Sequence, residues 1–141
     1  MESVALEFFE AHTGKIVDQV GFVSRDDNPY IASSPDGLIK NGNKYTEAVE
    51  VKCPSTAVYL EGWLEDKIPK DYEPQAIQYF IVNDDLEKLY FITFDPRVTI
   101  HPMHIIEMHR SEVEQKIAEY KLLQEVMLAK VESTLNELIQ I

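Results

Sequence analysis

Apolar residues recur at helical spacing from the first residues of the chain onwards. Within residues 1–13 this spacing is seen in Val4, Ala5, Phe8, Phe9 and Ala11. The pattern predicts a helix, and Gly14 is well placed to end it because glycine readily adopts the left-handed conformation found at helix C-termini. No capping residue precedes this helix, so we expect the chain to have been cut from a longer protein or to be an unusually short natural version.

The same spacing returns over residues 110–141. An apolar residue follows every three or four positions: Val113, Ile117, Tyr120, Leu123, Met127, Val131, Leu135 and Leu138. The pattern predicts one helix of about 48 Å, which is longer than the core of a small domain needs. We expect part of it to pack on another subunit, on another protein or on a further N-terminal region.

Alternating apolar and polar residues predict strands between these two helices. The expected strands cover residues 15–25, 30–33, 47–53, 88–95 and 98–108. The turn sequence Asp26-Asp27-Asn28-Pro29 joins the first two strands in a hairpin.

Two further helices are expected in the middle of the chain. Pro54 ends the third strand, and Ser55 or Thr56 can cap a helix that runs to about residue 61. Residues 63–71 are expected to form a loop, and residues 71–82 a helix that is buried because it has few polar residues. The whole pattern predicts an α/β fold in a single domain, residues 1–141, with helices flanking a central mixed sheet.

The strongest candidate chemistry lies in residues 33–54, SSPDGLIKNGNKYTEAVEVKCP. Asp36 lies in a Pro-Asp-Gly turn, and Glu50 follows 14 positions later in a predicted strand. That separation allows a hairpin, broken near Gly42, which brings the two carboxylates side by side. Because alternate strand residues share a face, Glu50 and Lys52 point the same way, and the valines beside them point into the core.

Two carboxylates this close repel each other unless a cation lies between them. Oxygen ligands with few His or Cys residues nearby favour Mg²⁺ or Mn²⁺ over Zn²⁺. A lysine beside the ion can orient or deprotonate a water and balance charge on a phosphate, as phosphodiester hydrolysis requires. Asp36 followed by Glu50-Val51-Lys52 resembles the PD-(D/E)XK nuclease pattern. The pattern alone is weak, and an exposed turn aspartate beside an ordinary strand ion pair is the competing interpretation.

The net charge of −12 changes the expectation for nucleic acid. An acidic surface does not attract DNA in general, so any DNA contact must come from a local groove and from metal ions. Cys53 is the single cysteine, which excludes an internal disulfide and fits a reducing cytoplasm; we assign it no chemistry. No apolar run has the length of a membrane span and no secretory signal is present, so we expect a soluble cytoplasmic protein with no membrane partner.

Three other polar residues each allow two interpretations. Glu2 is either a site residue or a carboxylate favoured by the dipole at a helix N-terminus. Gln75 and Gln78 lie on the helix predicted for residues 71–82, where a glutamine either reaches the lysine, a water or a phosphate oxygen, or lies on the surface.

An aromatic residue and two histidines complete the candidates. Trp63, with Lys67 and Lys70, either contacts a nucleic-acid backbone or covers the edge of the core. His101 and His104 are three apart on a predicted strand, which places them on opposite faces and argues against a metal pair.

Four motifs, taken in order, resemble the phage lambda exonuclease, or YqaJ-type viral recombinase, family. They are SSPDGL, EVKCP, YEPQ at residues 72–75 and YFITFDPR at residues 90–97. The resemblance covers nearly the whole chain and leaves out the family's N-terminal region, and it implies a restriction-endonuclease-like core within the α/β class.

The resemblance also implies roles for individual residues. Asp36 and Glu50 resemble the family's Mg²⁺ ligands, with the main-chain carbonyl of Val51 completing the site, and Lys52 resembles its catalytic lysine. Glu2 falls in a pattern similar to the family helix that bears an additional acidic residue.

A pair of glutamines extends the resemblance. Gln75 resembles the first glutamine of the family's Q-x-Q helix, and Gln78 lies one residue further along than the second. In that pattern Gln75 is a catalytic-site residue.

The implied function is a metal-dependent exonuclease that digests one strand of linear double-stranded DNA from its 5′ end in recombination. Members of the family form a ring-shaped trimer around DNA and act with a single-strand annealing protein. Two alternatives remain: an endonuclease or repair nuclease on the same core, and a nuclease relic that serves as a protein-interaction module.

Overall fold

The computed structural model describes residues 1–140. Its elements run in the order α1 (Glu2–Thr13), β1 (Val23–Ser24), β2 (Ala32–Ser33), β3 (Gly37–Asn41), β4 (Lys44–Lys52), α2 (Thr56–Glu65), the 3-10 turn η1 (Lys70–Tyr72), α3 (Glu73–Val82), β5 (Lys88–Phe94), β6 (Met103–His109) and α4 (Arg110–Ile139). Within this part of the chain, no helix combines the length and the apolar character that crossing a membrane requires.

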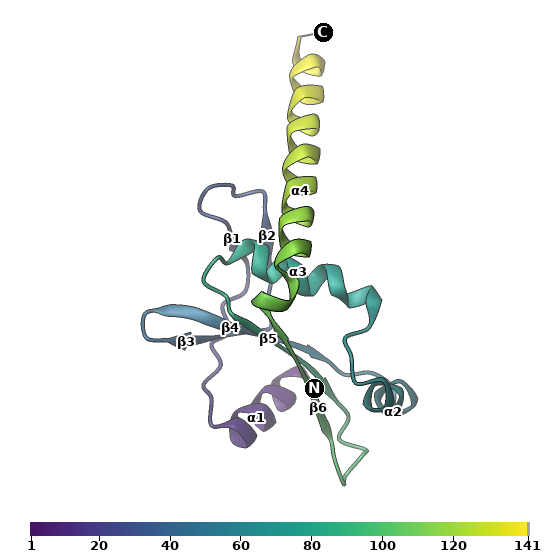
Figure 1. Ribbon diagram of the computed structural model, residues 1–141. Coiled ribbons are helices and arrows are strands. Elements are labelled where there is room, and N and C mark those ends of the chain that lie inside the picture. Colours follow the sequence, from purple (N-terminus) through teal and green to yellow (C-terminus); the bar gives the residue numbers. More distant parts are fainter. Residues whose placement is uncertain (141) are drawn as a thin grey trace.

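A four-stranded mixed sheet forms the centre of the fold (Figure 1), as predicted. Its strand order is β3-β4-β5-β6, in which β4 and β5 are parallel and the two outer pairs are antiparallel. A tight turn at Gly42, with φ of 68°, joins β3 to β4. The candidate motif strand β4 therefore lies inside the sheet, paired on both sides.

Helices cover the two faces of this sheet. Val49 and Val51 of β4 belong to the core under α1, which contributes Ala5, Leu6 and Phe9. Ala48 of β4 faces the other way, into a core built largely from α3. Residues of β4 thus alternate between two apolar layers, and the two valines lie where the pattern predicts.

The helix ends follow their local sequences. Gly14 ends α1 with φ of 74°, as predicted, and the Ser55 side chain caps α2 by accepting a hydrogen bond from the Val58 N–H. However, α2 runs to Glu65 and not to residue 61, because no proline interrupts the helical pattern before Pro69. Trp63, expected in a loop, therefore lies on a helix.

Two of the predicted strands are wrong over much of their length. Residues 15–25 form only the short strand β1 and one isolated bridge, between Asp18 and Leu38, since Gly21 has φ of 70° and interrupts the extended chain. The predicted hairpin with β2 does form, in shorter form. The last strand begins at Met103, because residues 95–101 make two consecutive turns: the Val98 N–H binds the Asp95 carbonyl and the His101 N–H binds the Val98 carbonyl.

Gly37 allows the segment before β1 to approach the sheet closely. A Cβ atom at Gly37 would lie 2.1 Å from Cγ1 of Val17, far inside van der Waals contact. The bridge between Asp18 and Leu38 forms at this approach. The residue next to the candidate Asp36 is therefore fixed by packing as well as by the turn.

Helix α4 is the long C-terminal helix that the pattern predicts, and it extends well away from the sheet (Figure 1). At its first residue, the Arg110 guanidinium donates to the carbonyls of Phe80, Asn83 and Leu86, at 2.9, 2.8 and 2.6 Å. Two of these carbonyls lie at or just after the end of α3, where a helix leaves its carbonyls unpaired. Arg110 thereby fastens α4 to the end of α3.

Candidate active site

Strand β4 presents a carboxylate and an ammonium group side by side. Glu50 is 4% exposed, and the Nζ of Lys52 lies 3.0 Å from its Oε1. The two residues are separated by one position on a strand, so they share a face, as the alternation predicts. Glu50 is buried between the sheet and α3, whereas the Lys52 side chain stays 26% exposed.

The bend before β3 brings a second carboxylate to the same strand. Oδ2 of Asp36 accepts a hydrogen bond from the Val51 N–H at 2.7 Å. The predicted hairpin therefore does bring Asp36 back to the strand that carries Glu50. A main-chain donor from β4 holds this carboxylate in position.

Burial disfavours the charged form of both carboxylates. It raises the pKa of Asp36, and the neighbouring Glu2 carboxylate raises it further, against the opposing effects of the Val51 N–H and the Lys52 ammonium. It likewise raises the pKa of Glu50, against the hydrogen bonds from Tyr79 and Lys52. The charge of Asp36 also raises the pKa of Glu50, so the two anions act on each other.

Glu2 lies in the first turn of α1 and close enough to Asp36 for its charge to act there. The two interpretations of Glu2 are therefore compatible: it is an acidic residue at a helix N-terminus and also a neighbour of the carboxylate pair. Helix α1 thus contributes a third carboxylate to this region.

Helix α3 contributes a residue that the sequence did not single out. The hydroxyl of Tyr79, which is 3% exposed, donates a short hydrogen bond to Oε2 of Glu50. Gln75, one turn earlier, donates through Nε2 to the Tyr79 hydroxyl at 3.4 Å. The i, i+4 spacing of Gln75 and Tyr79 is the signal that could have found the tyrosine.

The second glutamine of α3 points elsewhere. Nε2 of Gln78 donates to the Ala32 carbonyl at 3.2 Å, and its Oε1 accepts from Gln124 of α4. Gln78 therefore links α3 to β2 and to α4. It does not join the carboxylate pair, whereas Gln75 reaches that pair through Tyr79.

An aromatic ring lies beneath the lysine. Nζ of Lys52 lies 4.7 Å from the ring centroid of Tyr72, which in turn packs on Phe91 of β5. The ring face attracts the ammonium group and limits the directions in which Lys52 can point. Tyr72 lies in the YEPQ motif, but the sequence alone gave no reason to assign it a role.

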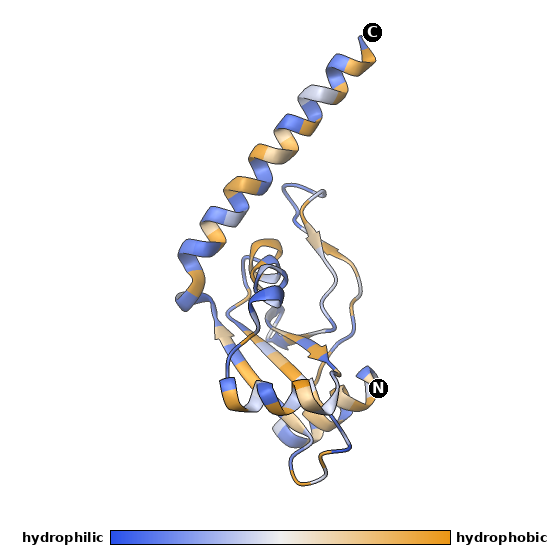
Figure 2. Cartoon of the chain, turned by 90° about the vertical axis from the view of Figure 1, so that its right-hand side faces the viewer, coloured by the Kyte–Doolittle hydropathy of each residue, from blue (hydrophilic) through white to orange (hydrophobic). Residues whose placement is uncertain are grey.

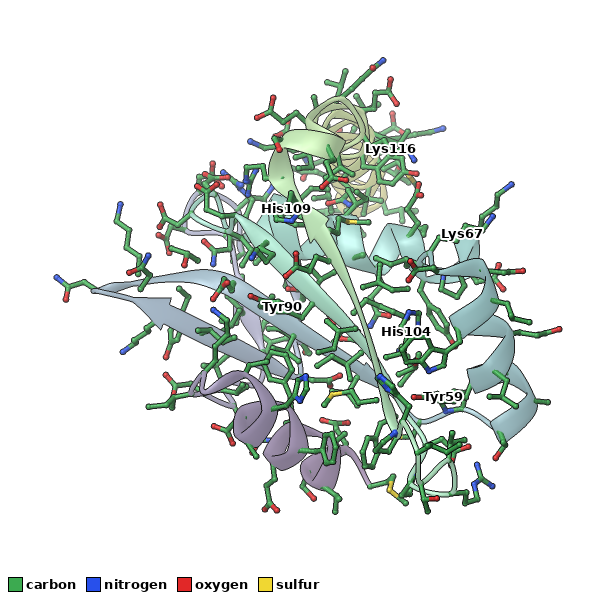
Figure 3. All side chains as sticks on the ribbon, turned by 60° about the horizontal axis from the view of Figure 1, so that its bottom comes forward. Tyr59, Lys67, Tyr90, His104, His109 and Lys116 are labelled. Atoms are coloured by element: carbon green, nitrogen blue, oxygen red, sulfur yellow. The ribbon has the colours of Figure 1, made fainter. Side chains whose placement is uncertain are left out.

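Trp63 and the two histidines form a separate cluster between α2 and β6. Figure 3 shows His104 and Tyr59 near each other, beside α2. Trp63 stacks on His104 at 4.2 Å and meets His101 edge-on at 4.5 Å, and His104 Nε2 lies 2.9 Å from Asp66 Oδ1. The prediction that the histidines lie on opposite faces is wrong, because His101 precedes β6 and both rings contact Trp63.

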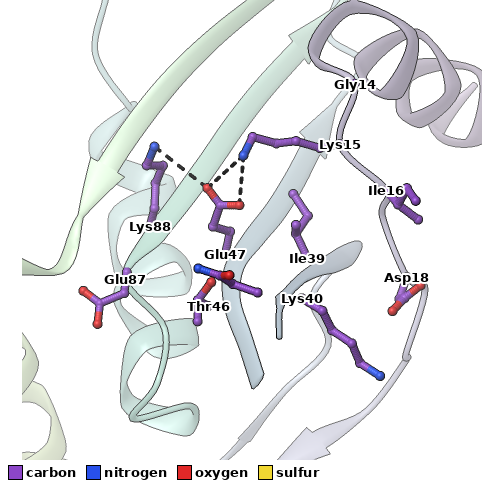
Figure 4. Close-up of a pocket in the computed structure, with 11 residues that line it drawn as sticks. Gly14, Lys15, Ile16, Asp18, Ile39, Lys40, Thr46, Glu47, Glu87 and Lys88 are labelled. Carbon is purple, nitrogen blue, oxygen red and sulfur yellow. Dashed lines mark hydrogen bonds and ion pairs between the residues drawn. The ribbon is translucent and has the colours of Figure 1, made fainter. Parts of the chain in front are cut away.

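A cavity of about 800 Å³ lies at the other end of β4. It is lined in part by Glu47, which Figure 4 shows between Lys15 and Lys88. Glu47 also accepts a hydrogen bond from the Tyr90 hydroxyl at 2.8 Å, so its charge is already compensated. Glu47 lies three positions before Glu50, about 10 Å along the strand, and points to the opposite face of the sheet, so the cavity is distinct from the carboxylate pair.

The carboxylate pair fits a hard divalent cation by its donor chemistry. Among residues 1–140 no group of three or more His, Cys, Asp or Glu side chains is arranged as a ready metal centre. Asp36 and Glu50 nevertheless supply oxygen donors, and their anionic forms are disfavoured by burial and by each other. A Mg²⁺ or Mn²⁺ ion would relieve both effects.

Comparison with known proteins identifies a family for this chain. The sequence profile of the YqaJ-like viral recombinase domain matches residues 1–85. None of the curated proteins matches the chain by sequence.

The fold is similar to that of a solved exonuclease structure. The alkaline exonuclease LHK-Exo from Laribacter hongkongensis matches with a TM-score of 0.71 and 22% sequence identity, over 97% of this chain and 71% of that chain. A crystal structure of LHK-Exo in complex with dAMP matches with a TM-score of 0.70 at the same identity and coverage. The predicted mixed sheet with flanking helices and a long C-terminal helix is thus confirmed, and it matches the fold of LHK-Exo.

Proposed function

Because this chain belongs to the YqaJ-like viral recombinase domain family, we propose that it is a metal-dependent deoxyribonuclease of the lambda exonuclease type. The proposed reaction is hydrolysis of phosphodiester bonds in linear double-stranded DNA, from the 5′ end, during recombination. The proposal assigns residues 1–141 to one nuclease-like domain.

One observation carries the proposal. Buried Glu50 forms an ion pair with the partly exposed Lys52 on β4, and Asp36 is fixed to the same strand through the Val51 N–H. An ordinary surface ion pair does not place a second half-buried carboxylate alongside, because the added desolvation lowers stability. A metal-binding role accounts for keeping two such carboxylates together.

We assign the metal ligands as follows. Asp36 and Glu50 would hold Mg²⁺, for which Mn²⁺ can substitute, together with the Val51 carbonyl, and Glu2 would contribute through a water molecule. When bound, the ion acts as a Lewis acid that lowers the pKa of a water and stabilises the leaving oxygen.

The remaining site residues act on protons and on position. Lys52 orients the attacking water and offsets negative charge that develops on the phosphate. Gln75 hydrogen-bonds to the water or to a phosphate oxygen. Tyr79 holds the Glu50 carboxylate, and the ring of Tyr72 restricts the direction of the Lys52 ammonium.

The similar structure supports DNA as the proposed substrate, and the net charge of the chain limits where DNA can bind. LHK-Exo was crystallised with dAMP, a deoxynucleotide of the kind that DNA hydrolysis yields. The net charge of −12 disfavours DNA over most of the surface, so we assign the contact to the immediate surroundings of the metal ligands. A homotrimer around the DNA and a single-strand annealing protein are the proposed partners.

The test compares linear and circular duplex DNA in the presence of Mg²⁺. We expect digestion of the linear DNA and none of the covalently closed circle. Lys52→Ala should lower the rate at least about 100-fold, which is typical of losing a residue that moves protons or stabilises charge. Lys44→Ala is the matched control, since Lys44 lies on the same strand with an exposed side chain, and should leave the rate within about twofold.

Two outcomes would contradict the proposal. Cleavage of the closed circle would favour the endonuclease or repair nuclease on the same core. No digestion of linear duplex with Mg²⁺ or Mn²⁺ would favour a nuclease relic that acts as an interaction module.

A further inference from the structure

One face of α4 packs on α3 and on the core beneath it. The same apolar face continues along the helix beyond these contacts. Residues spaced by three or four positions lie on one side of a helix, and on α4 they run Val113, Ile117, Tyr120, Gln124, Leu128, Val131 and Leu135. The first part of this row contacts the core beneath α3, and Gln124 bonds to Gln78. Val131 and Leu135 continue the row, and each is 53% exposed.

The outer part of this face forms one wall of a groove. A groove of about 590 Å³ lies between α4 and the loop that joins β1 to β2. Its apolar lining includes Leu128, Val131 and Leu135 on α4, with Pro29 and the 82% exposed Tyr30 opposite. Figure 2 shows α4 as a bare helix with apolar segments along the length that projects from the rest of the chain.

The charged residues of the groove all have one sign. Asp27, Glu125 and Glu132 line it, and no lysine or arginine does. Asp27 shares the buried guanidinium of Arg25 with Asp84, so one arginine compensates two carboxylates on the loop side. The groove therefore combines an apolar floor with an acidic rim.

This combination selects among occupants. A second copy of the chain would bring an acidic helix to an acidic rim, because residues 122–139 contain three glutamates and one lysine. Nucleic acid and anionic membranes are repelled for the same reason. A helix with an apolar face and basic flanks complements both the floor and the rim.

We propose that this groove docks an amphipathic helix with basic flanks from a partner protein. The lined part of α4, from Glu125 to Ile139, spans about 21 Å, which matches about four turns of such a helix. The groove lies against α4 and the β1–β2 loop, not against Glu50 and Lys52. The inference is thus independent of the proposed nuclease activity.

The test uses a fluorescent synthetic peptide of about eighteen residues, long enough for five helical turns. It carries leucines at i, i+3, i+4 and i+7 and lysines on both flanks, and binding to the full chain is followed by anisotropy. Two control peptides have the same composition in scrambled order, or glutamates in place of the lysines. We expect saturable binding of the basic helix and binding at least about tenfold weaker for both controls.

Matched variants locate the binding. Val131→Asn should weaken binding about tenfold, whereas Val126→Asn, on the same helix and similarly exposed at 57% but outside the groove, should leave it unchanged. Glu132→Gln should weaken binding severalfold at low salt, and Glu137→Gln, which does not line the groove, should not. Circular dichroism of each variant checks that α4 remains folded.

Three results would overturn the inference. They are absence of saturable binding to the basic peptide, equal effects of Val131→Asn and Val126→Asn, and equal binding of the scrambled or acidic peptide. Sedimentation that shows a dimer of the chain, dissociated by Val131→Asn, would also overturn it, since a second copy would then occupy the groove.

Discussion

Tyr79 offers a direct test of how the Glu50 carboxylate is held. Its hydroxyl donates to Glu50, and both side chains are almost fully buried. Tyr79→Phe removes this donor and leaves Lys52 as the partner of Glu50. A hydrogen bond to a charged group contributes about 1.5–3 kcal/mol, so we expect the free energy of unfolding to fall by about 2 kcal/mol. For 141 residues this lowers Tm by about 6 °C.

The loss should depend on pH in a definite direction. The Tyr79 hydroxyl lowers the pKa of Glu50, so its removal raises the folded-state pKa further above the unfolded value. A carboxyl whose pKa is raised on folding contributes stability that is present at low pH and is lost as the pH rises through the folded pKa. The variant should therefore be most destabilised above that pKa. At acidic pH Glu50 is protonated, and the difference should shrink to about 1 kcal/mol, the value of a neutral hydrogen bond.

Urea unfolding of metal-free protein at pH 8 and pH 5, followed by Trp63 fluorescence, measures both effects. Tyr90→Phe is the matched control, because the Tyr90 hydroxyl donates to Glu47 at 2.8 Å on the other face of the sheet. Glu47 is more exposed and keeps Lys15, so the control should lose about 1 kcal/mol. If Tyr79→Phe costs no more than Tyr90→Phe at pH 8, or if its cost does not fall at pH 5, the reasoning about Glu50 is refuted.

Three further predictions concern a close backbone approach, the anchoring of α4 and the charge of Asp36. Gly37→Ala should lower the free energy of unfolding by about 2 kcal/mol, because the added Cβ collides with Val17. Gly62→Ala, in open space on a helix, should raise the free energy of unfolding by about 1 kcal/mol, and urea unfolding compares the two variants. Arg110→Lys should lower Tm by about 6 °C in a thermal melt, because an ammonium group cannot reach three carbonyls in the guanidinium geometry, and an unchanged Tm would contradict this role. Asp36→Asn should raise the urea midpoint of metal-free protein at pH 8, where the carboxylate is charged against its raised pKa, and a lower midpoint would refute it.

The periodic parts of the sequence predicted the fold well. Helix α1 ends at Thr13 and α4 begins at Arg110, within a residue of expectation, and the residues of β4 alternate between the two cores as expected. These segments bury a continuous face, so their apolar residues must follow the period of the element.

The failures lie where hydrogen bonding overrides hydrophobic pattern. Residues 15–22 look like a strand but form one bridge to Leu38, since Gly21 turns the chain away from the sheet. Residues 98–102 look like a strand but close two turns that begin at the Asp95 carbonyl. Neither event changes the apolar pattern, so periodicity could not reveal it.

Some residues of the candidate site could be predicted from the sequence, and others could not. Asp36, Glu50 and Lys52 come together because a hairpin and strand alternation, both readable from sequence, are enough to do so. Tyr79 was missed because an aromatic residue on a buried helix normally belongs to the core, and Tyr72 was missed because it lies in the short turn η1, where nothing in the sequence marks a contact with Lys52. Only the positions of their neighbours, Lys52 and Glu50, reveal their polar or cation–π contacts.

Calorimetric titration of Mn²⁺ and Mg²⁺ into the protein tests most directly whether Asp36 and Glu50 form a metal site. The account predicts saturable binding to the unchanged chain and to Asp18→Asn, a control on a carboxylate that bonds to the Tyr45 hydroxyl away from the site. It predicts no saturable binding to Asp36→Asn. A flat titration of the unchanged chain, or equal binding by Asp36→Asn, would contradict it.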